Sequence, residues 1–408
     1  MSSDERPLVS IILPVFNTEQ YLKESLDCLV NQTLEDIEVI CINDASTDGC
    51  PEILEEYASK DSRFKILNNE DSLGPSICRN KGLEIASGEY IVFYDSDDKI
   101  DLDAYEKLYN FSKENDNDVV VFNAIRFNDN GYESPSVLHS KSITGETFTN
   151  TNILEHNELV YDTTSWNKFI KGDFFRKHNF TFAEGRVYQD ILFSMQLFCS
   201  TDSVGILPDV TYYWRIRGKT SNSITQKVFN TKNLHDRIFI ISNTINVIKS
   251  NEKYHELLDP LYVKLIEIDA LQFIRELDRC DDEFRQIMFG KVKSFVESLP
   301  DSAFNTIDDL DMVKYDLYLN DCQDSLKALV AKERQDKIDN RKKKSEINRL
   351  KKKNKRLDKK VQNMKKRNEK LKTKNKNLKN TNEKLYQDLD YLKTPSGWMK
   401  YHIKKITK

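Results

Sequence analysis

The segment YIVFYDSDDKID, residues 90–101, decides the fold of this chain and indicates its chemistry. Five residues suited to a buried strand run directly into a short stretch that contains Asp95, Asp97 and Asp98. Clustered carboxylates beside a buried strand are costly unless a cation neutralises them, and hard divalent cations prefer oxygen ligands. In open α/β sheets, ligands bind beyond the carboxyl ends of the strands. The segment therefore predicts a divalent cation at Asp95 and Asp97 that serves a phosphate-bearing substrate; an acidic, solvated loop is the alternative.

Strand-like and helix-like patterns alternate through the first 125 residues. Apolar runs and amphipathic runs predict strands at 8–16, 37–43, 64–67, 90–94 and 118–122, and helices at 18–31, 51–59, 75–86 and 102–114. This alternation with short connections implies an α/β fold with a mostly parallel sheet and helices on both faces. Residues 125–225 are mixed and rich in aromatic side chains, whereas residues 230–330 show helical patterns. We therefore expect an all-helical extension after the α/β part.

Size and composition set bounds on the kind of protein. With 408 residues, the chain is long enough for two or three domains. It contains no apolar run long enough for a transmembrane helix, and its polar N-terminal sequence MSSDERPL is unlike a signal peptide. The seven cysteines are scattered without a CxxC pair, so we expect reduced thiols and a cytoplasmic protein.

The net charge of −4 conceals two oppositely charged parts. Residues 331–408 contain 29 Lys and Arg against 9 Asp and Glu, whereas residues 1–330 contain 33 against 57. The chain thus combines an acidic body of net charge −24 with a basic C-terminal part of net charge +20. The basic part predicts an anionic partner such as lipid or a glycopolymer. Nucleic acid is disfavoured as a partner because the body is acidic.

A seven-residue repeat runs through residues 347–392. Its a positions are Ile347, Asn354, Val361, Asn368, Asn375, Asn382 and Leu389, and its d positions are Leu350, Leu357, Met364, Leu371, Leu378, Leu385 and Leu392. Such a repeat predicts a long coiled-coil helix, in which Asn at the a positions weakens the seam and fixes its register.

The charges that flank this seam oppose pairing. In a parallel homodimer Lys353 would attract the partner's Asp358, but three further pairs would repel one another: Lys360–Lys365, Arg367–Lys372 and Lys374–Lys379. Each like-charge pair costs a few tenths of a kcal/mol. We therefore expect a weak homodimer that anions or an acidic partner stabilise.

The last residues, 394–408, combine aromatic and apolar side chains with lysines. This composition suits an amphipathic helix at the inner face of an anionic membrane. A frayed, solvated terminus is the alternative, and the sequence favours neither.

Three further residues lie where a parallel sheet collects ligands. Asp44 closes the second strand and can accept a hydrogen bond from a base or ribose, although a turn or helix cap explains it too. Arg79 follows a glycine between a strand and a helix, where it can meet a phosphate or pair with a carboxylate. Asp190 begins an amphipathic helix and can remove a proton, although a carboxylate that favours the helix dipole is the simpler explanation.

Together these segments resemble family 2 glycosyltransferases of the GT-A fold, which is Rossmann-like. The resemblance covers residues 8 to about 225 and rests on six segments in order: VSIILPVFN (9–17), INDASTDG (42–49), GPSICRNKGLEIASGEYIVFYDSDD (74–98), WNKF (166–169), the Asp190 segment and YYWRIRGKTSNSIT (212–225). Each segment is short, but all six in this order are specific. They imply transfer of a sugar from a nucleotide-sugar donor, usually a UDP-sugar, to a glycan, glycopolymer or lipid-linked acceptor, with inversion at the anomeric carbon.

The resemblance also implies how the donor is bound. Pro14, Phe16 and Asn17 would border the nucleotide pocket. Asp44 matches the acid that hydrogen-bonds the base, and Arg79 lies in the stretch that lines the nucleotide-sugar pocket.

The same resemblance assigns the chemical step. Asp95 and Asp97 match the DXD motif, in which Asp97 would hold Mn²⁺ or Mg²⁺ and Asp95 the ribose side. Asp190 matches the catalytic base of the family's ED pair. Gln189 stands where that pair has its Glu, which leaves the choice of acceptor open.

The remaining matched residues lie later in the chain. Trp166 and Lys168 match a segment near the acceptor. Arg215 and Arg217 belong to a segment that approaches the diphosphate.

The sequence thus predicts four parts. They are a glycosyltransferase domain at 1–225, a helical extension at 226–335, a basic coiled coil at 336–393 and a basic amphipathic tail at 394–408. The competing hypothesis is a non-catalytic scaffold, or an anionic-polymer-binding protein, that carries a decayed transferase domain. The intact Asp44, Asp95, Asp97 and Asp190 argue against decay.

Overall fold

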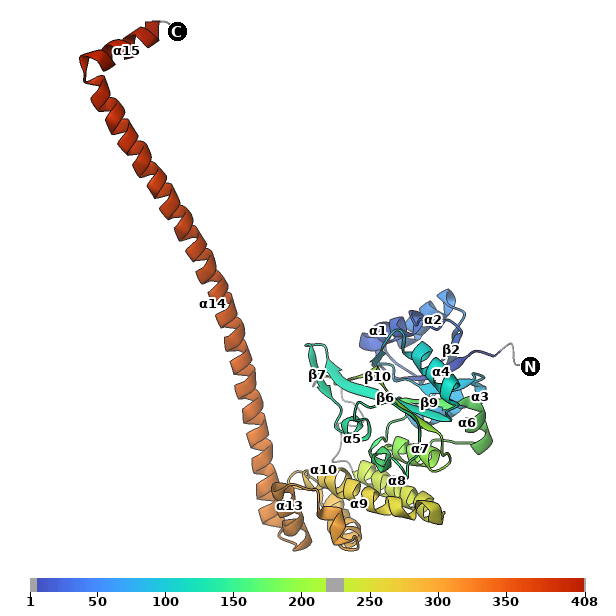
Figure 1. The fold of residues 1–408 in the computed structure, drawn as a ribbon. Coiled ribbons are helices and arrows are strands. Elements are labelled where there is room, and N and C mark those ends of the chain that lie inside the picture. The colour runs from blue at the N-terminus through green and yellow to red at the C-terminus, as the bar shows by residue number, and fades with distance from the viewer. Residues whose placement is uncertain (1–5, 218–230, 407–408) are drawn as a thin grey trace. The chain divides into compact units, whose positions relative to one another are not determined.

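The computed structural model describes residues 6–217 and 231–406 (Figure 1). The chain divides into two compact units, residues 1–330 and 331–408. The predicted boundary at 225/226 lies outside the described residues, as do residues 218–225 of the last matched segment. The division into four parts therefore stays a prediction.

The first unit is built around one ten-stranded sheet. Its strands are β1 Val9–Val15, β2 Ile37–Asn43, β3 Phe64–Asn68, β4 Tyr90–Phe93, β5 Lys99–Ile100, β6 Val119–Asn128, β7 Tyr132–Pro135, β8 Phe148–Thr151, β9 Lys168–Lys171 and β10 Val204–Arg215. The order is β3-β2-β1-β4-β9-β6-β10-β5, with β7 paired to β6 and β8 to β10. All five strands predicted from the sequence form; four have bounds close to those expected, whereas β6 continues six residues beyond the predicted end at 122.

The sheet is mixed, whereas we expected it to be mostly parallel. β1, β2, β3 and β4 are mutually parallel neighbours, and β6 is parallel to β10. Between these two groups lies β9, which runs antiparallel to both β4 and β6. The physical reason is the connection: the chain from β6 to β9 passes through the β6–β7 hairpin and short turns, not through a crossover helix on the sheet.

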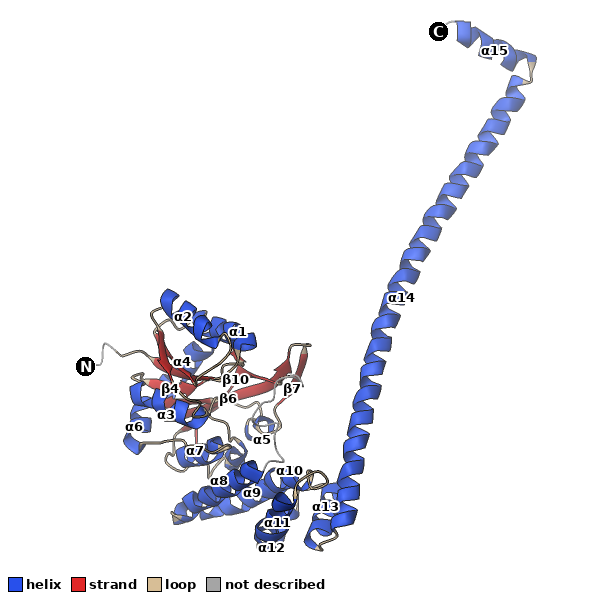
Figure 2. Ribbon diagram, turned by 180° about the vertical axis from the view of Figure 1, so that it is seen from behind, coloured by secondary structure: helices blue, strands red, loops and turns tan. Residues whose placement is uncertain are grey.

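Helices cover both faces of the sheet, as predicted (Figure 2). These helices are α1 Glu19–Val30, α2 Cys50–Lys60, α3 Pro75–Ile85, α4 Ala104–Asn115, α5 His139–Ser142, α6 Gly172–His178 and α7 Gln189–Phe198, with a 3-10 turn η1 at Asn157–Tyr161. Alternate residues of β1 enter two cores, because successive strand side chains point to opposite faces. Ile11 and Leu13 pack with α1, α2 and α4, whereas Ile12 packs in the core that contains α3, α6 and α7.

A helical part follows the sheet, as the sequence indicated. It comprises α8 Thr231–Lys249, η3 Glu252–Leu257, α9 Leu258–Lys264, the π-helical η4 Leu265–Ala270, α10 Leu271–Ile274, α11 Asp282–Ile287, η5 Met288–Val292, α12 Lys293–Glu297, η6 Asp301–Phe304 and α13 Asp309–Leu319. α8 and α9 place Ile248 and Leu261 in the same core as α7. Phe273, Phe284 and Tyr315 belong to a separate helical core.

The long C-terminal helix α14 runs without interruption from Gln323 to Leu392 (Figure 1). Leu326 and Val330 are buried in the helical core of the first unit. Beyond them the side chains are almost all exposed, and the a and d residues such as Leu350 and Leu371 are about half exposed, at 54% and 50%. The predicted helix is confirmed, but its pairing into a coiled coil stays a prediction.

The chain ends with α15, Pro395–Ile406. Among the described ranges, no helix combines the length and the apolar character needed to cross a membrane. Contact of the tail with a membrane surface stays a prediction.

Candidate active site

One buried arginine joins two acidic residues that are far apart in the sequence. Arg79, in α3, donates from Nη2 to Oδ1 of Asp95 at 2.9 Å and from Nη1 to Oδ1 of Asp190 at 3.4 Å. Its side chain is only 5% exposed, and its guanidinium lies over the Phe182 ring at 5.4 Å. Burial by itself lowers the pKa of Arg79, but the carboxylates of Asp190 and Asp95 raise it above its ordinary value. The loop after β4 and the start of α7 therefore meet at one fixed positive charge.

The two carboxylates remain open to solvent. The side chains of Asp95 and Asp190 are 32% and 24% exposed. Burial of the loop raises the pKa of Asp95, Arg79 opposes this, and the nearby carboxylates of Asp97 and Asp190 raise the pKa further. A second positive charge at this place would relieve that repulsion.

The loop that contains Asp95 and Asp97 is held in shape by Arg215, the last residue of β10, and by Arg217, which follows it. Arg215 donates from its backbone N–H to Oδ1 of Asp98 at 2.7 Å and from Nε to the backbone oxygen of Asp97 at 2.5 Å. Its side chain is 1% exposed and is paired with Glu24. Arg217 donates from Nε to Oδ2 of Asp97 at 2.5 Å. Arg215 is therefore a support of the loop, and Arg217 is the arginine that reaches a candidate cation ligand.

Asp44 is buried at the end of β2 and accepts four hydrogen bonds. They come from the Asn69 side chain at 2.8 Å, the Ser72 hydroxyl at 2.9 Å and the backbone N–H groups of Leu73 and Gly74 at 2.8 and 2.9 Å. Burial raises the pKa of Asp44, but these donors outweigh it and hold the pKa below its ordinary value. The carboxylate fixes the loop that leads into α3, so its predicted contact with a base stays a prediction.

The residues predicted to border the nucleotide lie at the end of β1. Phe16 is 46% exposed, and Pro14, two residues earlier, is partly buried. Asn17 adopts a positive φ of 49° and accepts a hydrogen bond at Oδ1 from the backbone of Thr47 at 2.8 Å. This contact joins the loops that follow β1 and β2, beside the half-exposed Phe16 ring.

Trp166 and Lys168 are buried and do not line a surface, and their predicted position near the acceptor stays a prediction. Trp166 is 3% exposed and stacks on Tyr212 with the ring centroids 4.2 Å apart. Lys168 is fully buried, and its Nζ donates to Asp162 Oδ1 at 2.6 Å and to the backbone oxygen of Thr164 at 2.5 Å. Because neither side chain reaches solvent, both act as supports behind the site.

Gln189, by contrast, belongs to the arginine cluster. With its amide oriented so that donors face acceptors, its oxygen accepts from Nη1 of Arg79 at 2.8 Å and its nitrogen donates to the backbone oxygen of Arg186 at 2.7 Å. A neutral amide therefore holds Arg79 beside Asp190, where an acid would have added another negative charge.

Comparison with known proteins decides the family. The family model described as glycosyl transferase family 2 matches residues 10–178. The chain is 31% identical over 260 residues to EpsH of Bacillus subtilis, which has a provisional glycosyltransferase name; the match covers 62% of this chain and 72% of EpsH. The chain belongs to glycosyltransferase family 2. This enzyme is a glycosyltransferase, as the sequence predicted.

Further relatives carry more specific names. The transferase is 29% identical over 306 residues to the poly(ribitol-phosphate) beta-glucosyltransferase of Bacillus spizizenii, a match that spans 72% of this chain and only 46% of that protein. The crystal structure of S. aureus TarS 1–349 in complex with UDP-GlcNAc has a TM-score of 0.63 and 21% identity, covering 80% of this chain and 91% of that chain. This likeness confirms the predicted GT-A fold.

The transferase offers oxygen ligands for a divalent cation, but not a complete set. Within residues 6–217 and 231–406, no group of three or more His, Cys, Asp or Glu is arranged to hold a metal. A cation that also binds substrate phosphates needs only one or two carboxylates. The partly exposed Asp95 and the Oδ1 atom of Asp97, which receives no hydrogen bond from a described residue, fit that need.

Sequence analysis missed the residues that shape the transferase site from behind. Tyr212 accepts a hydrogen bond at its hydroxyl from the backbone N–H of Asp95 at 3.0 Å, and Phe182 packs below Arg79. Asp162, the partner of Lys168, was also missed. The aromatic character of residues 210–218 was visible, but no spacing in the sequence indicated which of these rings would touch the DXD loop.

Proposed function

We propose that this transferase moves a sugar from a UDP-sugar to a hydroxyl group of a phosphate-containing cell-surface glycopolymer, with inversion and with a divalent cation. One observation carries the proposal: Arg79 holds Asp95 of the DXD loop and Asp190 of α7 on one guanidinium. This places a candidate cation ligand and a candidate base within one cluster that solvent reaches.

The residues suit a direct displacement. Asp190 takes the proton of the acceptor hydroxyl as the new bond forms, and Arg79 keeps that carboxylate in place. Asp97 and Asp95 would hold the cation, and Asp95 would also face the ribose. A bound divalent cation would offset the charge that develops on the diphosphate leaving group. Because the base activates the acceptor itself, no enzyme nucleophile is required.

The donor side of the proposal draws on the first hundred residues and on Arg217. Phe16, exposed at the end of β1, offers a face for the base. Arg217 donates to Asp97 and would turn toward a diphosphate bound beside that carboxylate. Asp44 contributes the fixed loop at 69–74 in addition to any contact of its own with the base.

Names of relatives support the donor and acceptor classes. Two crystal structures of S. aureus TarS 1–349 are complexes with UDP and with UDP-GlcNAc. Two relatives are named for poly(ribitol-phosphate) glucosylation and for minor teichoic acid biosynthesis. We therefore propose a polyol-phosphate polymer as the acceptor, within the wider class of glycan and lipid-linked acceptors.

The test is a panel of UDP-sugars with Mn²⁺ or Mg²⁺, measured by release of UDP with and without poly(ribitol phosphate). Polymer-dependent release from one donor, lost on chelation of the cation, is expected. Absence of turnover across the panel together with absence of UDP binding would instead support the scaffold hypothesis. UDP binding without turnover would point to a different sugar or acceptor.

A further inference from the structure

The middle of α14 carries a charge that nothing within the helix balances. Residues 341–379 contain 20 Lys and Arg against three acidic residues, over roughly 58 Å of helix. Among the described residues, the ion pair that reaches this segment joins Lys342 to Asp339 at 3.5 Å. Like charges three and four positions apart destabilise a helix. A segment so charged favours an external polyanion.

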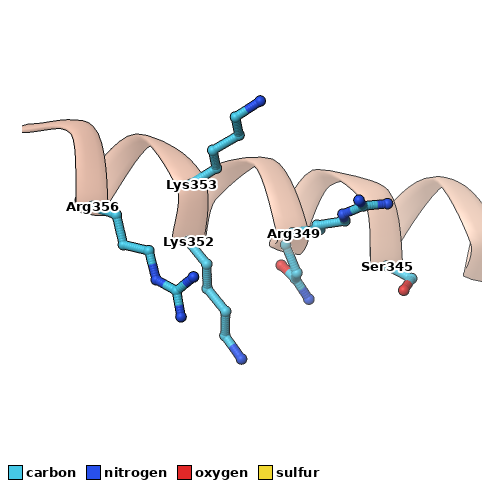
Figure 3. A pocket seen from close by; sticks show the side chains of 6 residues that line it. Ser345, Arg349, Lys352, Lys353 and Arg356 are labelled. Carbon is cyan, nitrogen blue, oxygen red and sulfur yellow. The ribbon is translucent and has the colours of Figure 1, made fainter.

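Part of this charge forms a stripe along one side of the helix, which Asn363 interrupts once. The c and f positions of the repeat between 349 and 370 include six cations, which we call the basic stripe: Arg349, Lys352, Arg356, Lys359, Lys366 and Lys370. Figure 3 shows Lys352 and Arg356 projecting from the same side of the helix, with Lys353 on the other side. Residues three and four apart lie about 5 Å from one another along that side.

The stripe and the apolar seam use opposite sides of α14. The a and d residues, such as Leu350 and Leu357, are about half exposed, and none of them belongs to the c and f rows. A hollow beside the stripe is lined by three of its members, Arg349, Lys352 and Arg356, together with the polar or charged Ser345, Asn348 and Lys353. A second copy can therefore occupy the seam while the stripe remains open.

Lipid is the poorer occupant. A strict seven-residue period drifts by about 20° per heptad on a straight helix, so the apolar seam follows a supercoiled partner better than a flat bilayer. The stripe itself offers no apolar side chain to insert. An extended polyanion needs only the row of charges.

We propose that the basic stripe binds the polyanionic acceptor itself, a polyol chain linked by phosphodiesters, outside the active site. The inference rests on the proposed function for the identity of the polymer. The first 330 residues carry a net charge of −24 and therefore repel a polyanionic acceptor. The basic α14 attracts it, which would offset that repulsion. Retention on the stripe raises the local concentration of acceptor units for successive transfers.

The test compares two quadruple variants of the full chain that remove equal charge. The stripe variant is R349Q/K352Q/R356Q/K359Q, and the control is K360Q/K365Q/R367Q/K372Q, which alters the flanks of the seam. Gln is nearly as good a helix former as Lys and Arg, and circular dichroism checks that helicity is kept. Binding of labelled poly(ribitol phosphate) is measured by anisotropy from about 50 to about 200 mM salt.

We expect the stripe variant to bind the polymer at least tenfold more weakly and the control less than threefold. The salt slope should fall by about three for four lost phosphate contacts. The KM for the polymer should rise in the stripe variant, while UDP-sugar turnover without polymer stays unchanged. Equal weakening in both variants would overturn the proposal, since it would show only a diffuse charge effect.

Other ligands separate the remaining explanations. Vesicles of equal parts phosphatidylglycerol and phosphatidylcholine, and oligo(dT), are offered at the same phosphate concentration. Tighter binding of either one through the stripe would overturn the assignment to a polyol polymer. Wild-type protein that binds the polymer yet transfers no sugar would refute the proposed function alone, whereas transfer with an unchanged KM in the stripe variant would refute the stripe alone.

Discussion

Replacing Asp190 with Asn tests the proposed base with little change in structure. The Asn side chain has the same shape, and its oxygen can still accept from Arg79 Nη1, now 3.4 Å from Asp190 Oδ1. That contact is long and the Asp190 side chain is 24% exposed, so its loss should cost less than about 1 kcal/mol of unfolding free energy. The fold and the donor side should therefore survive.

The rate of sugar transfer, by contrast, should fall strongly in Asp190→Asn. A positioned general base contributes about 10²–10⁴-fold, which corresponds to about 3–5 kcal/mol in the barrier. We expect kcat for Asp190→Asn to fall by at least about a hundredfold. Affinity for UDP should change by less than about twofold, because the change adds no clash and removes no proposed donor contact.

Initial rates of UDP release and calorimetric titration with UDP measure the two quantities separately. Glu184→Gln is the matched control, since it also converts a carboxylate to an amide near α3, where Glu184 accepts from Asn80 at 3.3 Å. The control should keep its rate. Equal losses of rate and UDP affinity in Asp190→Asn would show that Asp190 holds the donor, and an unchanged rate would remove it from the mechanism.

Four more outcomes follow from the geometry. Lys168→Met should lower the free energy of unfolding by about 3–5 kcal/mol in urea titration, because it leaves the buried Asp162 carboxylate without its cation. A stable variant that binds acceptor poorly would instead support the acceptor role of Lys168. Burial lowers the pKa of His139 to about 4, so below about pH 6.5 the imidazole takes up a proton in the unfolded state but not in the folded state. The free energy of unfolding should therefore fall by about 3 kcal/mol between pH 6.5 and 4. Denaturation curves of His139→Gln should lack this component of the pH dependence. Arg217→Gln should strengthen Mn²⁺ binding to the free enzyme roughly fivefold in paramagnetic resonance titration, since Arg217 competes with the cation for Asp97, and unchanged binding would exclude that competition. Sedimentation of the full chain should show more dimer through α14 as salt rises and screens repulsion; a tight, salt-insensitive dimer would contradict the predicted weak seam.

The strands and helices before residue 125 were predictable because each obeys local rules, except the two-residue strand β5, which was not predicted. β2 was predicted at its observed bounds, and α3 within one residue, since Pro75 and the preceding Gly74 mark its start. β9 could not be predicted. Its four residues gain their place from contacts with β4 and β6, which are distant in the sequence and leave no periodic signal.

The acidic residues of the site were found, but the partners of the basic ones were not. Arg79 had two open interpretations, phosphate or carboxylate, and in this structure it pairs with carboxylates. Lys168 and Arg215 read as substrate contacts from their motifs, yet both are buried in ion pairs. Burial depends on tertiary packing, and a charged side chain in a short motif gives no sign of it.

Arg79 contacts two carboxylates, Asp95 and Asp190, that are far apart in the sequence, and this has a consequence for synthesis of the protein. Most residues that we assign to the donor and the cation leave the ribosome within the first hundred, whereas the proposed base lies on α7 and Arg217 follows β10. A nascent chain or proteolytic fragment that stops before α7 would hold the guanidinium of Arg79 with one carboxylate in place of two. Such a fragment would also lack β10, whose Tyr212 and Arg215 hold the loop of Asp95 and Asp97. We therefore expect competence for transfer only after both α7 and β10 have joined the sheet.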